Sequence, residues 1–147
     1  MTSLNRNVVW AEDDLADRVL FQRAISKAGL QMEPYFVGDG VELIQYLKNE
    51  GSYTDRTTAP RPDLILLDLN MPRIDGREVL AFLKADHDLR RIPVVIFSTT
   101  NAPSEVVTSY DLGVNSFITK PGSFEKLVKT MKLIEGYWAC ACEVPAV

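Results

Sequence analysis

The sequence predicts an α/β fold, a doubly wound parallel sheet of five strands in the order 2-1-3-4-5. Short apolar runs alternate five times with longer segments whose apolar residues recur at helical spacing. Such βα alternation is typical of a parallel sheet with helices on both faces, joined by right-handed crossovers. The chain of 147 residues is long enough to bury one core, and it contains no internal repeat. We therefore expect a single domain over residues 1–147, with its core at about 6–135.

The predicted strands are short, and their composition indicates where they lie in the sheet. The run Leu64–Leu67 reads L-I-L-L, so both of its faces are apolar, as in the middle of a parallel sheet. Pro34 cannot donate to a β-ladder, which places the second strand at an edge of the sheet. The predicted strands are residues 7–11, 32–37, 64–67, 93–97 and 116–118.

The predicted helices begin at residues that favour helix termini. Asp13 or Asp14 can cap the first helix, and Ser123 can cap the last. Pro103 suits the first turn of the fourth helix. The predicted helices are residues 15–28, 41–48, 77–85, 103–112 and 124–134, and a long polar loop lies at 49–62. The last helix is expected to extend into residues 136–147.

Apolar residues at helical spacing indicate the helix faces that should pack on the sheet. In the first helix they are Leu15, Val19, Leu20, Ile25 and Ala28. In the last helix they are Phe124, Leu127, Val128, Met131, Leu133 and Ile134. Each of these two helices is therefore expected to bury one face.

Charge and composition exclude several classes of function. A net charge of -4 argues against general nucleic-acid binding, which needs a basic surface. No apolar run approaches the roughly 18 residues of a membrane span, and the N-terminus lacks the features of a signal peptide. Cys140 and Cys142 are the only cysteines, which rules out a disulfide framework. We therefore expect a cytoplasmic protein with no nucleic-acid or membrane partner.

Polar side chains follow four of the predicted strands, at the points where these strands end. Glu12 and Asp13 follow the first strand, Asp68 the third, Ser98 the fourth and Lys120 the fifth. The carboxyl ends of parallel strands lie along one edge of the sheet, so we expect these groups to converge. The sequence thus predicts three carboxylates, a hydroxyl and an ammonium at one edge.

This set of groups suits phosphoryl transfer to a carboxylate. Three carboxylates in contact repel one another, and a divalent cation would cancel that repulsion. A small number of oxygen ligands is typical of Mg²⁺ rather than of zinc. The sole histidine, His87, lies at the far end of a predicted helix, so no histidine-activated nucleophile is expected. A carboxylate held between Mg²⁺ and a lysine can instead accept a phosphoryl group.

Four motifs, in this order, resemble the receiver domain of two-component response regulators, which has a flavodoxin-like fold. They are V-V-W-A-E-D-D, L-I-L-L-D-L-N-M-P, P-V-V-I-F-S-T-T and F-I-T-K-P, and the resemblance covers nearly the whole chain. It implies that Asp68 is the phosphoacceptor and that Glu12 and Asp13 form the acidic pair of an Mg²⁺ site, with Asp13 a direct ligand. The backbone carbonyl of Asn70 would be a further metal ligand. Asn70 and Thr100 would also tune the lifetime of the phosphate.

The resemblance also implies which groups respond to phosphorylation. Lys120 would contact the phosphate, and the Lys120–Pro121 peptide bond would be cis. Ser98 would be the switch hydroxyl and Phe117 the switch aromatic, at positions where Thr and Tyr are frequent in the family. Phe117 has no hydroxyl, so any switching would depend on its packing alone. The alternative for Phe117 is a core residue of the last strand, and the two interpretations stand equal.

Two features resemble the single-domain regulators that pair with bacterial and cyanobacterial phytochromes. One is the long loop at 49–62, and the other is the last helix continuing into I-E-G-Y-W. They imply a phytochrome-like sensor histidine kinase as partner and no DNA-binding module. Tyr137 and Trp138 would join a homodimer through the fourth and fifth helices and the fifth strand, or else pack on the domain's own core. Leu20 and Ala24 would form a docking surface for the kinase, or else pack in the core.

The resemblance implies a regulator rather than an enzyme, one that takes phosphate from phosphohistidine and loses it by hydrolysis. A phosphotransfer intermediate or phosphate sink is one alternative, and a phosphatase or mutase with an aspartyl-phosphate intermediate is another. Such enzymes of the haloacid-dehalogenase group usually have a second Asp two residues after the nucleophile, where this chain has Asn70. A degenerate receiver that only binds partners is disfavoured, because every acidic ligand and Lys120 are retained.

Overall fold

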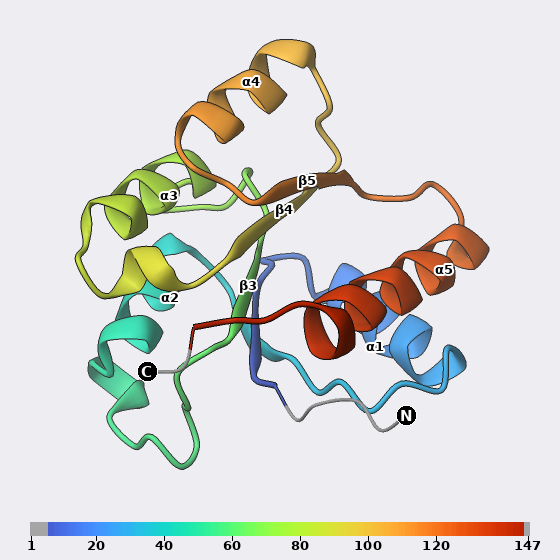
Figure 1. Cartoon of the computed structure of the whole chain (residues 1–147), viewed down its shortest axis with the longest axis horizontal. Helices are drawn as coiled ribbons and strands as arrows, with labels where there is room; N and C mark the ends of the chain where they lie inside the picture. Colours follow the sequence, from blue (N-terminus) through green and yellow to red (C-terminus); the bar gives the residue numbers. More distant parts are fainter. Residues whose placement is uncertain (1–5, 146–147) are drawn as a thin grey trace.

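A parallel five-stranded sheet forms the centre of the computed structural model, which describes residues 6–145 apart from the side chains of residues 139–141. The strands are β1 (Val8–Ala11), β2 (Tyr35–Val37), β3 (Leu64–Leu67), β4 (Val94–Ser98) and β5 (Ser116–Thr119). Their order is β2-β1-β3-β4-β5, as predicted (Figure 1). Strand β2 starts directly after Pro34, so it lies at the predicted edge but is shorter than predicted, since proline has no N–H to donate.

Five α-helices cover the two faces of the sheet. They are α1 (Leu15–Lys27), α2 (Gly40–Lys48), α3 (Gly76–Ala85), α4 (Pro103–Asp111) and α5 (Phe124–Ile134). Helices α1 and α5 lie on one face, and α2, α3 and α4 lie on the other (Figure 1). The sheet therefore separates two apolar cores, one beneath α2 and α3 and the other beneath α1 and α5. None of the described helices is long and apolar enough to cross a membrane.

Aspartate and serine side chains cap four of these helices at their N-termini. Asp14, rather than Asp13, caps α1, and Ser123 caps α5 as predicted. Asp39 and Asp75 cap α2 and α3 in the same way. Each cap satisfies backbone N–H groups that the helix itself leaves free. The caps therefore determine where the chain turns from the carboxyl edge of the sheet into each helix.

The buried faces of α1 and α5 differ from the prediction. Leu15, Val19 and Leu20 are exposed by 69%, 46% and 41%, and in α5 Phe124 and Leu133 are exposed by 41% and 73%. The residues of α1 and α5 that are buried are Phe21, Ala24, Ile25, Leu127, Met131 and Ile134. The prediction is therefore confirmed for Ile25, Leu127, Met131 and Ile134. It is wrong for Leu15 and Val19, which lie on nearly the opposite side of α1 from Phe21 and Ala24 at 100° per residue.

An aromatic cluster fills the core beneath α1. The ring of Trp10 stacks on Phe21 with centroids 4.2 Å apart and an interplanar angle of 7°. Phe97 meets both rings edge-on, at 5.4 Å from Trp10 and 5.5 Å from Phe21. The Trp10 indole Nε1 is buried and has no hydrogen-bond partner among the described residues. Aromatic packing, rather than hydrogen bonding, therefore holds this side chain.

The long loop at 49–62 is packed against α2 through polar contacts. It contains a short 3₁₀ helix, Gly51–Tyr53, and the Tyr53 hydroxyl donates to the Glu42 carboxylate. The Tyr46 hydroxyl donates to the backbone carbonyl oxygen of Pro60 at 2.9 Å. The side-chain amide of Asn49 donates to the backbone carbonyl oxygen of Tyr53 at 2.8 Å. The predicted loop is therefore an ordered cover for one end of α2.

An ion pair joins the loop after β3 to the start of α2. Arg73 donates from Nε to Asp39 Oδ2 and from Nη2 to Asp39 Oδ1, both at 2.9 Å. The backbone of Arg73 has φ +66°, in the left-handed region that non-glycine residues rarely adopt. The bidentate pair compensates for this backbone cost and holds the loop in place.

The chain continues beyond α5 as a π-helix, Glu135–Ala141, so the predicted extension of the last helix is confirmed. The sequence did not predict that the extension would have the wider turn of a π-helix. Trp138 packs against the core beneath α1 and α5, whereas Tyr137 is 56% exposed. Arg6 donates to the carbonyl oxygens of Trp138 and Cys142, at 2.5 and 2.7 Å, and so ties the first described residues to this segment. The Cys142 thiol is free, and the side chain of Cys140 lies outside the described part of the chain.

Candidate functional site

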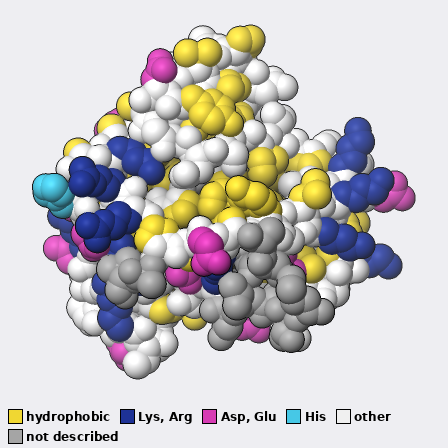
Figure 2. Space-filling view, in the orientation of Figure 1, with side chains coloured by type: hydrophobic (Ala, Val, Ile, Leu, Met, Phe, Trp, Pro, Cys, Tyr) yellow, Lys and Arg dark blue, Asp and Glu magenta, His cyan; other side chains and the backbone are white. Residues whose placement is uncertain are grey.

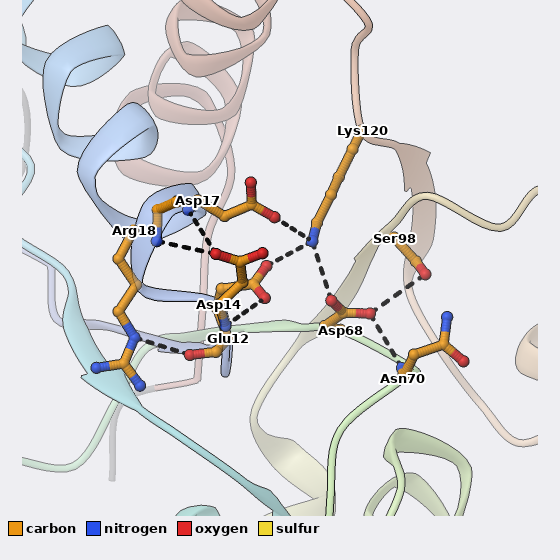
Figure 3. A network of polar contacts seen from close by, with 9 residues as sticks. Glu12, Asp14, Asp17, Arg18, Asp68, Asn70, Ser98 and Lys120 are labelled. Atoms are coloured by element: carbon orange, nitrogen blue, oxygen red, sulfur yellow. Dashed lines mark hydrogen bonds and ion pairs between the residues drawn. The ribbon is translucent and has the colours of Figure 1, made fainter.

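Four polar groups meet at the carboxyl edge of the sheet because the strands deliver them in register. The N–H of Glu12 donates to Val37 O at 3.0 Å, and the N–H of Asp68 donates to Ala11 O at 3.1 Å. The N–H of Lys120 donates to Ser98 O at 2.8 Å. These backbone bonds extend the sheet by one residue beyond the strand ends, which places the side chains of Glu12, Asp68, Ser98 and Lys120 around a common point (Figure 3). The convergence predicted from the sequence is thus observed.

The Lys120 ammonium is shared by three carboxylates. Its Nζ lies 2.5 Å from Glu12 Oε1, 3.0 Å from Asp68 Oδ2 and 3.2 Å from Asp17 Oδ2. The side chain of Lys120 is 10% exposed, and that of Glu12 is 1% exposed. An ammonium has three N–H donors, so every donor has an acceptor in this arrangement.

Burial and charge shift the ionisation of both members of the Lys120–Glu12 pair. Burial raises the pKa of Glu12 to about 7, although the hydrogen bond from Lys120 lowers it. Burial lowers the pKa of Lys120, but hydrogen bonds to Glu12 and Asp68 outweigh that effect, so this pKa is raised. Lys120 therefore stays charged at neutral pH, and Glu12 exchanges its proton near neutrality.

The carboxylate of Asp68 is buried and held from three sides. Its Oδ1 accepts from the backbone N–H of Asn70 at 3.0 Å and from the Ser98 hydroxyl at 3.3 Å, while Oδ2 faces Lys120. Behind it, a Cβ on Gly76 would lie 2.6 Å from the carbonyl oxygen of Asp68. Only glycine allows α3 to start this close to the acidic group. Asp68 is therefore fixed on a rigid element, with its oxygens directed to the edge of the sheet.

The acidic residues form a cluster that can hold a divalent cation. Ligand atoms of Glu12, Asp13 and Asp68 lie within 4.8 Å of one another. Asp13 is exposed, whereas the other two are buried, so the cluster opens to solvent on the side of Asp13. The Lys120 ammonium supplies one positive charge against this cluster, so a hard divalent cation fits the remaining negative charge and the oxygen donors.

In the described part of the chain, the side chains of the other predicted site residues, Asn70, Thr100 and Phe117, make no hydrogen bond to Asp68. The side chain of Asn70 is exposed and that of Thr100 is half-buried. Phe117 is half-buried and packs against the core beneath α2 and α3. The Lys120–Pro121 peptide bond is trans, so the predicted cis bond is wrong. The trans isomer is the more stable form of most X–Pro bonds, by about 0.5–1 kcal/mol.

Two further residues of the site were not predicted from the sequence. Asp17 contacts Lys120, and the Nε of Arg18 donates to the backbone carbonyl of Glu12 at 2.8 Å. The guanidinium of Arg18 also lies 5.4 Å from the ring centroid of Phe36. The available signal was the spacing of Asp17 and Phe21, which places Asp17 on the buried face of α1.

Comparisons with known proteins identify relatives over nearly the whole chain. The family model for the response regulator receiver domain matches residues 8–132. The response regulator Rcp1 of Synechocystis is 39% identical over 139 residues, which are 95% of this chain and 92% of Rcp1. The crystal structure of the phosphorylated cyanobacterial phytochrome response regulator RcpA has a TM-score of 0.86 at 43% identity, covering 96% of this chain and 99% of RcpA. The Mn²⁺-bound form of Rcp1 has a TM-score of 0.84 at 38% identity, covering 96% of this chain and 99% of that structure.

Proposed function

This chain belongs to the response regulator receiver family, and on that premise we propose that Asp68 accepts a phosphoryl group from a sensor histidine kinase. The observation that carries the proposal is the environment of Asp68, a buried carboxylate beside the Lys120 ammonium and the Ser98 hydroxyl. The side chains of Glu12 and Asp13 complete the acidic cluster on the same edge. The arrangement positions and neutralises charge, which is what phosphoryl transfer chiefly requires of a protein.

In the proposed reaction a carboxylate oxygen of Asp68 attacks the phosphorus of the kinase's phosphohistidine. An O–P bond forms, the N–P bond breaks, and its electron pair returns to the imidazole of the kinase. Lys120, whose ammonium lies 3.0 Å from Asp68 Oδ2, neutralises charge on the phosphoryl oxygens. The Ser98 hydroxyl then donates to the new phosphate instead of to the carboxylate. Hydrolysis of the acyl phosphate returns the site to its starting state, at a rate tuned by Asn70 and Thr100.

We further propose that the metal of this site is Mg²⁺. Glu12, Asp13 and Asp68 would hold it, with the backbone carbonyl of Asn70 as an additional ligand. The cation would offset the repulsion among the carboxylates and the charge that develops on the phosphoryl oxygens. The existence of an Mn²⁺-bound form of the relative Rcp1 supports divalent metal binding by this chain.

The signal would leave the site through the face formed by α4, β5 and α5. Ser98 moves towards the phosphate, and Phe117 repacks in the space that it leaves. Hydrophobic side chains gather across this face (Figure 2). Val107 and Tyr110 of α4 are exposed by 59% and 49%. Large apolar side chains exposed together on one face are typical of a protein–protein interface. We propose that a homodimer forms here, with Tyr137 at its interface and Trp138 supporting it from the core.

The proposed partner is a phytochrome-type sensor histidine kinase, and the proposed location of the reaction is the cytoplasm. The similarity to RcpA supports this pairing. Leu20 of α1 is 41% exposed, so its core alternative, the favoured interpretation from the sequence, is wrong, and its side chain is available for docking of the kinase. Ala24 is fully buried, so its assignment to a docking surface is wrong and its core alternative holds. The apolar side chains that α1 exposes beside Leu20 are Leu15 and Val19.

Incubation with acetyl phosphate and Mg²⁺ tests the proposal without a kinase. A receiver acquires one phosphoryl group on Asp68, detected by intact-protein mass spectrometry, and Asp68→Asn abolishes it. A phosphatase of the aspartyl-phosphate class would release phosphate with continuous turnover, and a phosphate sink would retain it without dimerising. Equal labelling of the natural chain and Asp68→Asn would refute Asp68 as the acceptor.

A further inference from the structure

Helix α1 contributes two side chains near the Lys120 ammonium, and Figure 3 shows one of them, Asp17, on the side of the ammonium away from Asp68. The Asp17 carboxylate lies 3.2 Å from Lys120 Nζ, and the ring centroid of Phe21 lies 5.7 Å from the same atom. Asp17 and Phe21 are four residues apart, so they share one face of α1. One helix therefore offers the ammonium both an anion and an aromatic ring.

A lysine side chain needs such support because its four-carbon stem is flexible. Of the three carboxylates that contact Lys120, Glu12 and Asp68 also belong to the acidic cluster. Asp68 is, in addition, the group that becomes esterified in the proposed reaction. Asp17 lies outside the cluster and is 30% exposed. Asp17 is therefore the carboxylate partner of Lys120 that neither binds the metal nor accepts the phosphoryl group in the proposed reaction.

We propose that Asp17 is a positioning residue that holds the Lys120 ammonium beside Asp68 during phosphoryl transfer. This inference rests on the proposed function. Asp17 does not touch the phosphoryl group and acts through Lys120 alone. Because Asp17 stands in the first turn of α1, the same helix that exposes Leu15 and Val19, the position of the ammonium is tied to the position of that helix.

The charge of Asp17 has a competing effect that the choice of variant separates. A carboxylate near the site repels an anionic phosphodonor, so loss of its charge alone would speed phosphorylation. Asp17→Asn removes the charge but keeps an oxygen that can accept from the ammonium. Asp17→Ala removes both. A positioning role therefore predicts that Asp17→Ala is phosphorylated more slowly and that Asp17→Asn is not. A purely electrostatic role predicts that both variants are phosphorylated faster.

The test measures the rate of Asp68 phosphorylation by acetyl phosphate with saturating Mg²⁺, on phosphate-affinity gels. Asp17→Ala should be slower by about fivefold, the size expected for a partly exposed ion pair, and Asp17→Asn should match or exceed the natural rate. In a Lys120→Ala background, Asp17→Ala should cause no further slowing, because its effect passes through the lysine. Glu78→Ala is the matched control, since Glu78 is an exposed acid in the first turn of α3.

Three results would refute the role of Asp17. They are an unchanged rate in Asp17→Ala, a faster rate in both Asp17 variants, or an equal slowing by Asp17→Ala with and without Lys120. Urea unfolding of each variant separates loss of fold from loss of positioning, and Asp17→Asn provides a second variant that keeps the helix terminus intact. Absence of phosphorylation in the natural chain would instead refute the proposed function, so the two failures are distinguishable.

Discussion

Glu12→Gln probes the electrostatics of the acidic cluster through the pH dependence of folding. Burial raises the pKa of Glu12 from 4.5 to about 7, against the lowering effect of the hydrogen bond from Lys120. A carboxyl whose pKa is raised on folding stabilises the fold fully below pH 4.5, and this contribution is lost as the pH rises through about 7. A pKa shift of this size in Glu12 corresponds to about 3 kcal/mol in the free energy of unfolding.

Urea titration without metal, at about pH 5 and about pH 8, measures this contribution. The natural chain should lose about 2.5 kcal/mol relative to Glu12→Gln over this range, because glutamine does not ionise and part of the full effect is already lost at pH 5. Glu78→Gln removes an exposed carboxylate and should retain the natural profile. If the natural chain and Glu12→Gln lose stability in parallel, the reasoning is wrong.

Mg²⁺ should oppose this loss of stability at high pH in the natural chain. A divalent cation binds the ionised carboxylates and competes with the proton on Glu12. Saturating Mg²⁺ should therefore raise the free energy of unfolding more at about pH 8 than at about pH 5, by mass action on the folded state. Equal stabilisation at the two pH values would place the cation away from Glu12.

Three further substitutions test the supports of the site. Gly76→Ala would place a methyl group 2.6 Å from the carbonyl oxygen of Asp68, so we expect a loss of about 2 kcal/mol or more in urea unfolding and slower phosphorylation. Asp39→Ala removes a helix cap and the partner of Arg73, and should cost about 1–2 kcal/mol in the same assay. Tyr53→Phe removes one hydrogen bond of the long loop, and should cost about 1 kcal/mol and expose the loop to proteolysis. Unchanged stability in any of the three would contradict its assigned contact.

The convergence of Asp68, Ser98 and Lys120 could be predicted because it follows from chain order alone. Parallel strands have their carboxyl ends on one edge, so residues that end strands meet there whatever their separation in sequence. The helix starts were equally accessible where local signals mark them, as Pro103 and Ser123 do, because such signals act within one turn. Local chemistry and topology thus account for the scaffold of the site.

The orientation of α1 could not be predicted, because two faces of this helix are apolar. Leu15 and Val19 have helical spacing as clear as that of Phe21 and Ile25, yet they face solvent. Which face packs on the sheet depends on the neighbouring strands, and the stacking of Phe21 on Trp10 is a tertiary contact. Asp17 was missed for the same reason, since its role becomes visible only when the buried face is known.

Trp10 gives the molecule a native optical reporter beneath its charged centre. The indole stacks on Phe21 with ring centroids 4.2 Å apart, and the Lys120 ammonium lies 5.7 Å from the centroid of the same Phe21 ring. Indole fluorescence responds to nearby charge, so displacement of the lysine should change the emission of Trp10. Uptake of a cation or of phosphate could then be followed without an attached dye, with Trp138→Phe removing the emission of the second tryptophan.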